Sequence, residues 1–161
     1  MDNESEVILG IVPGTRYLGI AVMHDSELRD WRIKTFSGRW SSAKKKKILN
    51  AIERIINQHQ VTSISLKKFH PSRSSKNLIE LISEIRQLAK SKRLEVYSYT
   101  VDEIKASFSD EKMMNKKCLA KMLIDRNPEF RFELNQERKN PSSYHIRMFE
   151  AVALAKIYSR Y

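Results

Sequence analysis

The amino-acid sequence predicts an α/β fold: a mixed five-stranded sheet with helices on both of its faces. Two observations predict it. Three apolar, β-rich segments follow one another in the first 36 residues, and two short β-rich segments then alternate with segments of helical periodicity. Strands joined by short turns pair antiparallel, whereas strands joined through a helix pair parallel. The expected sheet therefore has three antiparallel strands followed by two parallel ones.

The first three strands are predicted to form a meander. Val7–Val12 is continuously apolar and ends at Pro13-Gly14, which is typical of a strand buried on both faces. Arg16–His24 is the second apolar segment, and the short turn between the two predicts a hairpin. Glu27–Phe36 alternates apolar and polar residues once a shift before Trp31 is allowed, so it is predicted as the third, antiparallel strand.

Helices and strands alternate after residue 40. Ser42 is predicted to cap a helix whose isoleucines form one stripe, and Thr62–Lys67 is a short β-rich strand. Residues 75–92 carry leucine and isoleucine at helical spacing and end in basic side chains, which the C-terminus of a helix favours. Leu94–Tyr99 is predicted as the fifth strand. The remaining helices are predicted over Val101–Phe108, Asn115–Ile124 and Ser143–Tyr161, with a polar loop over 126–142.

The length and charge of the chain limit the kinds of function that it can have. A chain of 161 residues suits one domain, so we expect residues 1–161 to fold as a single unit. The formal net charge is +11, and residues 41–161 alone hold 25 Lys/Arg against 13 Asp/Glu, a balance of +12. Such an excess favours polyanionic partners, nucleic acid first, because each neutralised phosphate releases counterions. The single cysteine, Cys118, forms no internal disulfide, and no signal peptide or membrane-spanning run is visible, so we expect a cytoplasmic protein that does not contact membranes.

The first hairpin carries a family resemblance. Its sequence, Ile8-Leu9-Gly10-Ile11-Val12-Pro13-Gly14-Thr15-Arg16-Tyr17-Leu18-Gly19-Ile20-Ala21-Val22, resembles the first motif of RuvC-type Holliday-junction resolvases, which belong to the ribonuclease H-like superfamily. That motif is an apolar strand, Asp-Pro-Gly-Thr/Ser, and a strand with Gly-x-Ala/Gly-Val, in which the second glycine, Gly19 here, lets another element approach closely. The order of elements in the rest of the chain agrees. The resemblance implies a ribonuclease H-like fold, DNA as the partner and a homodimer.

The resemblance also implies that most metal-binding acids of the family are replaced. The magnesium-binding aspartate of the first motif falls at Val12, and the second acid falls at Lys67 or one residue earlier, at Leu66. The segment Phe149-Glu150-Ala151-Val152-Ala153-Leu154-Ala155 keeps the third acid, Glu150, while Arg147 stands where an acid or histidine is usual. An alkyl side chain offers no ligand to a hard cation, and a cation can pair with Glu150 once the metal is gone. We therefore expect a degenerate site with no bound metal, in which Glu150 is the retained catalytic-site acid.

A histidine near Glu150 is a weaker candidate ligand. His145 precedes Glu150 by five residues. That spacing is about 140° around a regular helix, so the two side chains do not readily face one ion. We favour a capping or phosphate-contacting role for His145 over a metal-binding one.

Basic side chains provide candidate phosphate contacts. The run Lys44–Lys47 lies in the first turn of a helix, where the helix dipole disfavours cations, so phosphate contact is weighed there against a merely solvated surface. A second basic segment follows the fourth strand, at the edge where this fold presents ligands. The complete set of predicted nucleic-acid contacts is Arg16, Lys44, Lys45, Lys46, Lys47, Lys67, Lys68, His70, Arg73, Lys116, Lys117, His145 and Arg147.

Together these features predict a RuvC-like domain that binds branched or structured DNA through a basic face, cleaves it weakly or not at all, and needs no cofactor. One alternative is a divergent magnesium-dependent Holliday-junction endonuclease, in which Glu150 and His145 are joined by a further acid such as Asp102 or Glu103. The other alternative is a non-catalytic protein-interaction scaffold, which salt-dependent DNA binding would distinguish.

Overall fold

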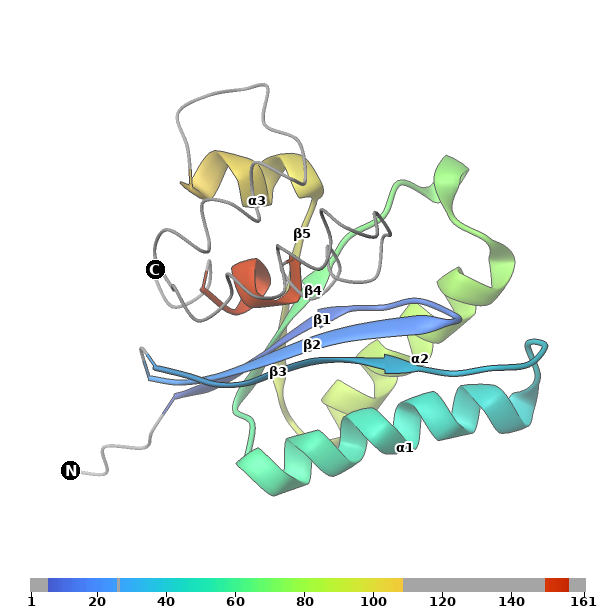
Figure 1. Cartoon of the computed structure of the whole chain (residues 1–161), viewed down its shortest axis with the longest axis horizontal. Helices are drawn as coiled ribbons and strands as arrows, with labels where there is room; N and C mark the ends of the chain where they lie inside the picture. Colours follow the sequence, from blue (N-terminus) through green and yellow to red (C-terminus); the bar gives the residue numbers. More distant parts are fainter. Residues whose placement is uncertain (1–5, 26, 109–149, 157–161) are drawn as a thin grey trace, which may run out of the picture.

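The computed structural model describes residues 6–25, 27–108 and 150–156. Its five strands form one sheet in the order β3-β2-β1-β4-β5 (Figure 1). The strands β1 (Val7–Val12), β2 (Tyr17–His24) and β3 (Glu27–Thr35) pair antiparallel, whereas β4 (Ser63–Lys67) pairs parallel with β1, and β5 (Glu95–Tyr99) pairs parallel with β4. The predicted mixed sheet is confirmed, with strand ends within one residue of those expected.

Helices cover both faces of the sheet. The long helices α1 (Ser42–His59) and α2 (Lys76–Ser91) pack on one face, while α3 (Val101–Phe108) and a helical segment over 150–156 lie on the other (Figure 1). A single 3-10 turn, η1 (Pro71–Arg73), precedes α2. No helix in the described ranges has the length and apolar character needed to cross a bilayer.

The residue that caps α1 differs from the one predicted. Ser41, and not Ser42, caps α1, because its side chain accepts the backbone N–H of Lys44 at 3.1 Å while Ser42 is already helical. Ser75 caps α2 in the same way through the N–H of Leu78. The predicted helix over Asn115–Ile124, the loop over 126–142 and most of the helix predicted over Ser143–Tyr161 lie outside the described residues.

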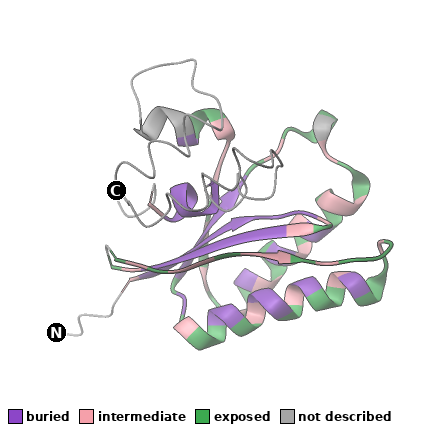
Figure 2. Ribbon diagram, in the orientation of Figure 1, coloured by how far each residue is buried: buried purple, intermediate pink, exposed green. Residues whose placement is uncertain are grey.

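The central strand β1 is buried on both faces (Figure 2). Ile8 and Val12 pack toward segment 150–156, whereas Val7, Leu9 and Ile11 pack toward α1 and α2. Gly10 lies between them at the closest approach to the helical segment: a Cβ there would be 2.2 Å from the carbonyl oxygen of Ala151. A close approach of a helical segment to the sheet is therefore observed at Gly10, and the close approach expected at Gly19 stays a prediction.

The pairing of β2 with β3 contains the predicted shift. Val22 is opposite Asp30 and Met23 is opposite Leu28, so the register changes between Val22 and Met23 and leaves Arg29 as the extra residue. This bulge accounts for the interrupted alternation in the sequence of β3.

A histidine pair joins β2 to α1. The Nε2 of His24 lies 3.2 Å from the Nδ1 of His59, and the Nε2 of His59 lies 3.6 Å from an oxygen of Asp30. Burial lowers the pKa of His24, and the charges of His59 and Arg29 lower it further, against an opposing effect of Asp25 and Glu27. The folded state therefore favours neutral His24.

We expect stability to fall as the pH drops through about 6.5, because the unfolded chain then protonates His24 while the folded chain resists it until a lower pH. Above that pH the contribution is fully present. Urea unfolding at a series of pH values should show this loss in the wild-type chain and a flatter profile in His24→Gln. His70→Gln, a change at an exposed histidine, is the control. An unchanged pH profile in His24→Gln would show that His24 does not carry the effect.

Candidate functional site

Two parallel strands end side by side at one edge of the sheet. Ile11 of β1 is opposite Leu66 of β4, so the last residues of these strands, Val12 and Lys67, are neighbours. The helical segment 150–156 packs on the same face and brings Glu150 to this edge. The structure thus brings together three positions that the sequence resemblance had singled out.

Lys67 and Glu150 form a buried ion pair. The Nζ atom of Lys67 lies 2.6 Å from Oε2 of Glu150, and the two side chains are only 7% and 1% exposed. The ring of Phe69 lies against the same ammonium group, 4.8 Å from its centroid. The predicted pairing of a cation with Glu150 is therefore observed with Lys67.

Alternation along β4 explains why Lys67 is the residue that meets Glu150. Leu66 belongs to the apolar cluster beneath α1 and α2, so its neighbour Lys67 points to the opposite face, where segment 150–156 lies. The sequence had left the family's second acid position open between Lys67 and Leu66; of these two residues, Lys67 is the one that contacts Glu150.

The side chains that the structure describes at this edge do not fit a magnesium ion. Hard divalent cations take oxygen ligands, and two-metal hydrolysis needs several converging carboxylates. Val12 is fully buried and presents methyl groups, Lys67 brings a positive charge, and a carboxylate oxygen of Glu150 contacts that charge. Within the described ranges no three His, Cys, Asp or Glu side chains gather as a metal site.

The additional acids considered for a nuclease site lie at the start of α3. Glu103 and Thr100 form a reciprocal cap: the Glu103 carboxylate accepts the N–H of Thr100 at 3.2 Å, and the Thr100 hydroxyl accepts the N–H of Glu103 at 3.1 Å. Asp102, in the same turn, is exposed, whereas Glu150 is buried. Glu103 therefore has a structural role in starting α3.

Four predicted contacts lie outside the described residues. They are Lys116, Lys117, His145 and Arg147. Their roles, including the pairing of Arg147 with Glu150, remain predictions.

The connection between β4 and α2 holds the second predicted basic segment. Lys68 is exposed, and its backbone N–H donates to the carbonyl of Tyr99 at 2.8 Å, which fixes the start of the connection. His70 caps η1: its Nδ1 accepts the N–H of Ser72 at 3.2 Å. Arg73 lies in η1, and its side chain is outside the described residues. Sequence reasoning missed Arg86 of α2, which joins Lys68 in lining a cavity of about 230 Å³.

Two of the four consecutive lysines have partners within the protein. Lys44 is buried, and its ammonium group donates to the carbonyl of Gly38 at 2.8 Å. Lys45 contacts Glu80 at 2.7 Å and Glu84 at 3.5 Å, both on α2. The hydrogen bond between Lys45 and Glu80 raises the pKa of the lysine and lowers the pKa of the glutamate. These two lysines therefore hold α1 to its surroundings, which explains cations at the unfavourable end of the helix.

The other predicted cations on this side are exposed. Lys46 and Lys47 lie on the outer surface of α1, and Arg16 lies in the turn between β1 and β2 with its guanidinium 5.4 Å from the centroid of the Tyr17 ring. Phosphate contact by these residues remains a prediction. Sequence reasoning missed Lys34, Arg39 and Arg54, which the structure places around Lys47. The spacing of seven residues between Lys47 and Arg54 was the available signal, because it spans two helical turns.

Comparison with known proteins identifies a matching family and similar folds. The family model described as crossover junction endodeoxyribonuclease RuvC matches residues 8–128. The fold is similar to that of Thermus thermophilus RuvC, with a TM-score of 0.71 and 14% identity over 96% of this chain and 95% of that one. It is also similar to the T. thermophilus RuvC in complex with Holliday junction substrate (TM-score 0.69, 16% identity, 96% and 95% covered). A third similar structure is the Fowlpox virus resolvase with substrate Holliday junction DNA (TM-score 0.61, 13% identity, 96% and 97% covered).

No curated protein sequence matches this chain. The family match nevertheless spans most of the chain, and it begins in the strand that carries the first motif. The chain therefore belongs to the crossover junction endodeoxyribonuclease RuvC family.

Proposed function

We propose that this chain is a RuvC-family domain that binds branched DNA and has lost most or all of its nuclease activity. The observation that carries the proposal is the buried ion pair of Lys67 with Glu150 at the edge where β1 and β4 end. Two of the structurally similar proteins are resolvases in complex with Holliday junction DNA, which supports DNA as the partner.

The loss of cleavage follows from the charge at this edge. Family cleavage uses magnesium held by acids, and here an ammonium group contacts the retained acid while a valine replaces another. If Glu150 turned to a metal, the charge of Lys67 would lose its partner. Because the Lys67 side chain is only 7% exposed, this loss costs about 3–5 kcal/mol.

Surface charge supports the proposed binding of DNA. Arg16, Lys46, Lys47 and Lys68 are exposed, and residues 41–161 have a balance of +12. Exposed cations release counterions from nucleic acid, which supplies affinity without base contacts. We keep the homodimer and the single domain over 1–161 as parts of the proposal, since family resemblance and length favour them.

The test is binding and cleavage of a synthetic four-way junction. We expect binding that weakens steeply as salt is raised, and no cleavage with magnesium or manganese, because the site lacks a cage of oxygen ligands. Fluorescence anisotropy reports the first and a denaturing gel reports the second.

Two variants make the result decisive. Glu150→Gln tests whether any cleavage seen depends on the retained acid, and Lys67→Met/Glu150→Leu removes both charges together, so it should stay folded and bind like the wild type. Cleavage by the wild-type chain that both variants abolish would overturn the proposed loss of activity. Binding that does not respond to salt would overturn the proposed role in DNA binding.

A further inference from the structure

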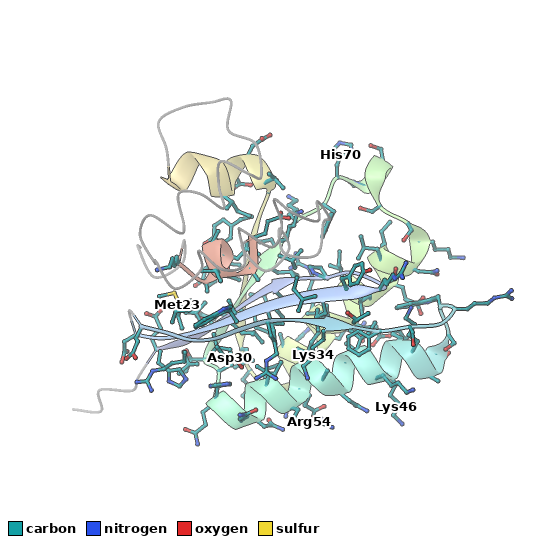
Figure 3. The ribbon with its side chains drawn as sticks, viewed as in Figure 1. Met23, Asp30, Lys34, Lys46, Arg54 and His70 are labelled. Atoms are coloured by element: carbon teal, nitrogen blue, oxygen red, sulfur yellow. The ribbon has the colours of Figure 1, made fainter. Side chains whose placement is uncertain are left out.

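A basic groove lies away from the Lys67–Glu150 pair, between the end of β3, the connection to α1, and α1 itself. Three adjoining hollows of about 490, 490 and 340 Å³ form it, and all three are lined by Thr35 and Phe36. Together these hollows are called the β3–α1 groove. It lies on the face of the sheet that α1 covers, and Figure 3 shows Lys34 and Arg54 from its two walls.

The groove is positively charged along its length. Its charged lining residues are Arg16, Lys34, Arg39, Lys44, Lys47 and Arg54, and no Asp or Glu lines any of the three hollows. The ammonium group of Lys44 already donates to the carbonyl of Gly38. Among the described residues, no carboxylate forms an ion pair with Lys34, Arg39, Lys47 or Arg54. By contrast, Arg32 of β3, Lys45 of α1 and Lys92 just after α2 all have acidic partners. A merely solvated surface does not account for cations gathered without acids around concave space.

Local structure explains why these cations converge. Lys34 is the cross-strand partner of Leu18, which packs toward α1, so Lys34 lies on the α1 side of the edge strand β3. Lys47 and Arg54 are two helical turns apart and therefore share one face of α1, with Asn50 between them in the lining. Their separation along the helix is about 10 Å.

One end of the groove lies at the turn that follows β1. Arg16 lies in the turn that follows the end of β1, and its carbonyl accepts the N–H of Phe36 at 2.8 Å, which ties this turn to the groove. A cationic path therefore runs from the strand ends past Arg16 into the groove and along α1 to Arg54. Phe36 and Trp40 are half-buried in its walls and add flat apolar surface near Arg16.

We propose that the β3–α1 groove binds the phosphate backbone of a DNA strand that leaves the junction, with Lys34, Lys47 and Arg54 as its main contacts. This inference rests on the proposed function, and it adds a second contact surface on the face of the sheet opposite the Lys67–Glu150 pair. The groove contacts the backbone, so its contribution does not depend on sequence.

The experiment compares matched double variants of the full chain. Lys47→Gln/Arg54→Gln removes two groove cations from α1, and Lys90→Gln/Arg93→Gln removes two exposed cations near the end of α2. Binding of a four-way junction is measured by anisotropy across a salt series, and Lys34→Gln tests the same groove from β3. We expect the groove double variant to bind at least about tenfold more weakly near 100 mM salt, with a salt slope smaller by about 2, while the α2 double variant changes little.

The outcomes separate the two proposals. If the wild-type chain shows no salt-dependent binding, both the proposed function and the proposed role of the groove are wrong. If the wild-type chain binds and the two double variants bind equally well, only the proposed role of the groove is wrong. If poly-glutamate binds as tightly as DNA and the groove double variant loses both equally, the groove accepts acidic protein and its assignment to DNA is wrong. Should the groove double variant unfold, as seen by circular dichroism, wild-type affinity in Lys34→Gln overturns the inference, and a salt slope reduced by about 1 supports it.

Discussion

Replacing Lys67 with methionine is expected to lower the free energy of unfolding by about 3–5 kcal/mol, the cost of leaving a buried charge without its partner. Glu150 is 1% exposed, and its carboxylate lies 2.6 Å from the ammonium group that the change removes. Methionine fills a volume similar to that of the lysine stem, so a cavity adds little to the loss. Urea unfolding followed by circular dichroism measures it.

The double variant Lys67→Met/Glu150→Leu is the control that isolates the charge. With both charges gone, the site becomes an apolar extension of the cluster that already contains Val12, Phe69 and Tyr99, and stability should return to within about 1 kcal/mol of the wild type. The coupling between the two sites would then be large. Additive losses in the double variant would mean that Lys67 and Glu150 do not act as a pair, and the structural basis for an inactive site would fail.

The fold was predictable because the strands differ in their burial. A strand buried on both faces, such as Val7–Val12, is continuously apolar, and the short turn after it leaves a hairpin as the simplest connection. The helix boundaries were less secure: two adjacent serines, Ser41 and Ser42, both suit a cap, and only the direction of the Ser41 side chain toward the N–H of Lys44 decides between them.

The site was predictable in part. Resemblance placed Val12, Lys67 and Glu150 at one location, and the geometry brings them there. Sequence alone could not assign the lysines of α1, because the acids that hold Lys45 lie on α2, 35 and 39 residues away. The groove cations were missed for the same reason: Lys34 and Arg54 come from a strand and a helix that only the folded chain places side by side.

Replacing Gly10 with alanine is the second change for which we expect a large loss, about 3 kcal/mol in the free energy of unfolding. The added Cβ would lie 2.2 Å from the carbonyl oxygen of Ala151 and 2.9 Å from the backbone nitrogen of Ala155. Both are backbone atoms, so no side-chain rotation relieves the clash and the helical segment 150–156 must move as a unit. Gly38→Ala is the control: apart from its chain neighbours, no atom of the described residues lies within 4 Å of a Cβ placed there, so only its positive φ of 91° adds a cost, about 1–2 kcal/mol.

The same displacement should reach the ion pair, because Glu150 begins the segment that alanine at position 10 pushes away from β1. Once Gly10→Ala has separated Glu150 from Lys67, removing the lysine costs less than it does in the wild-type chain. The losses from Gly10→Ala and Lys67→Met should therefore be less than additive, by about 1–3 kcal/mol. Full additivity would show that segment 150–156 absorbs the extra methyl group without moving Glu150, and that the close contact at Gly10 and the pairing at Lys67 are independent.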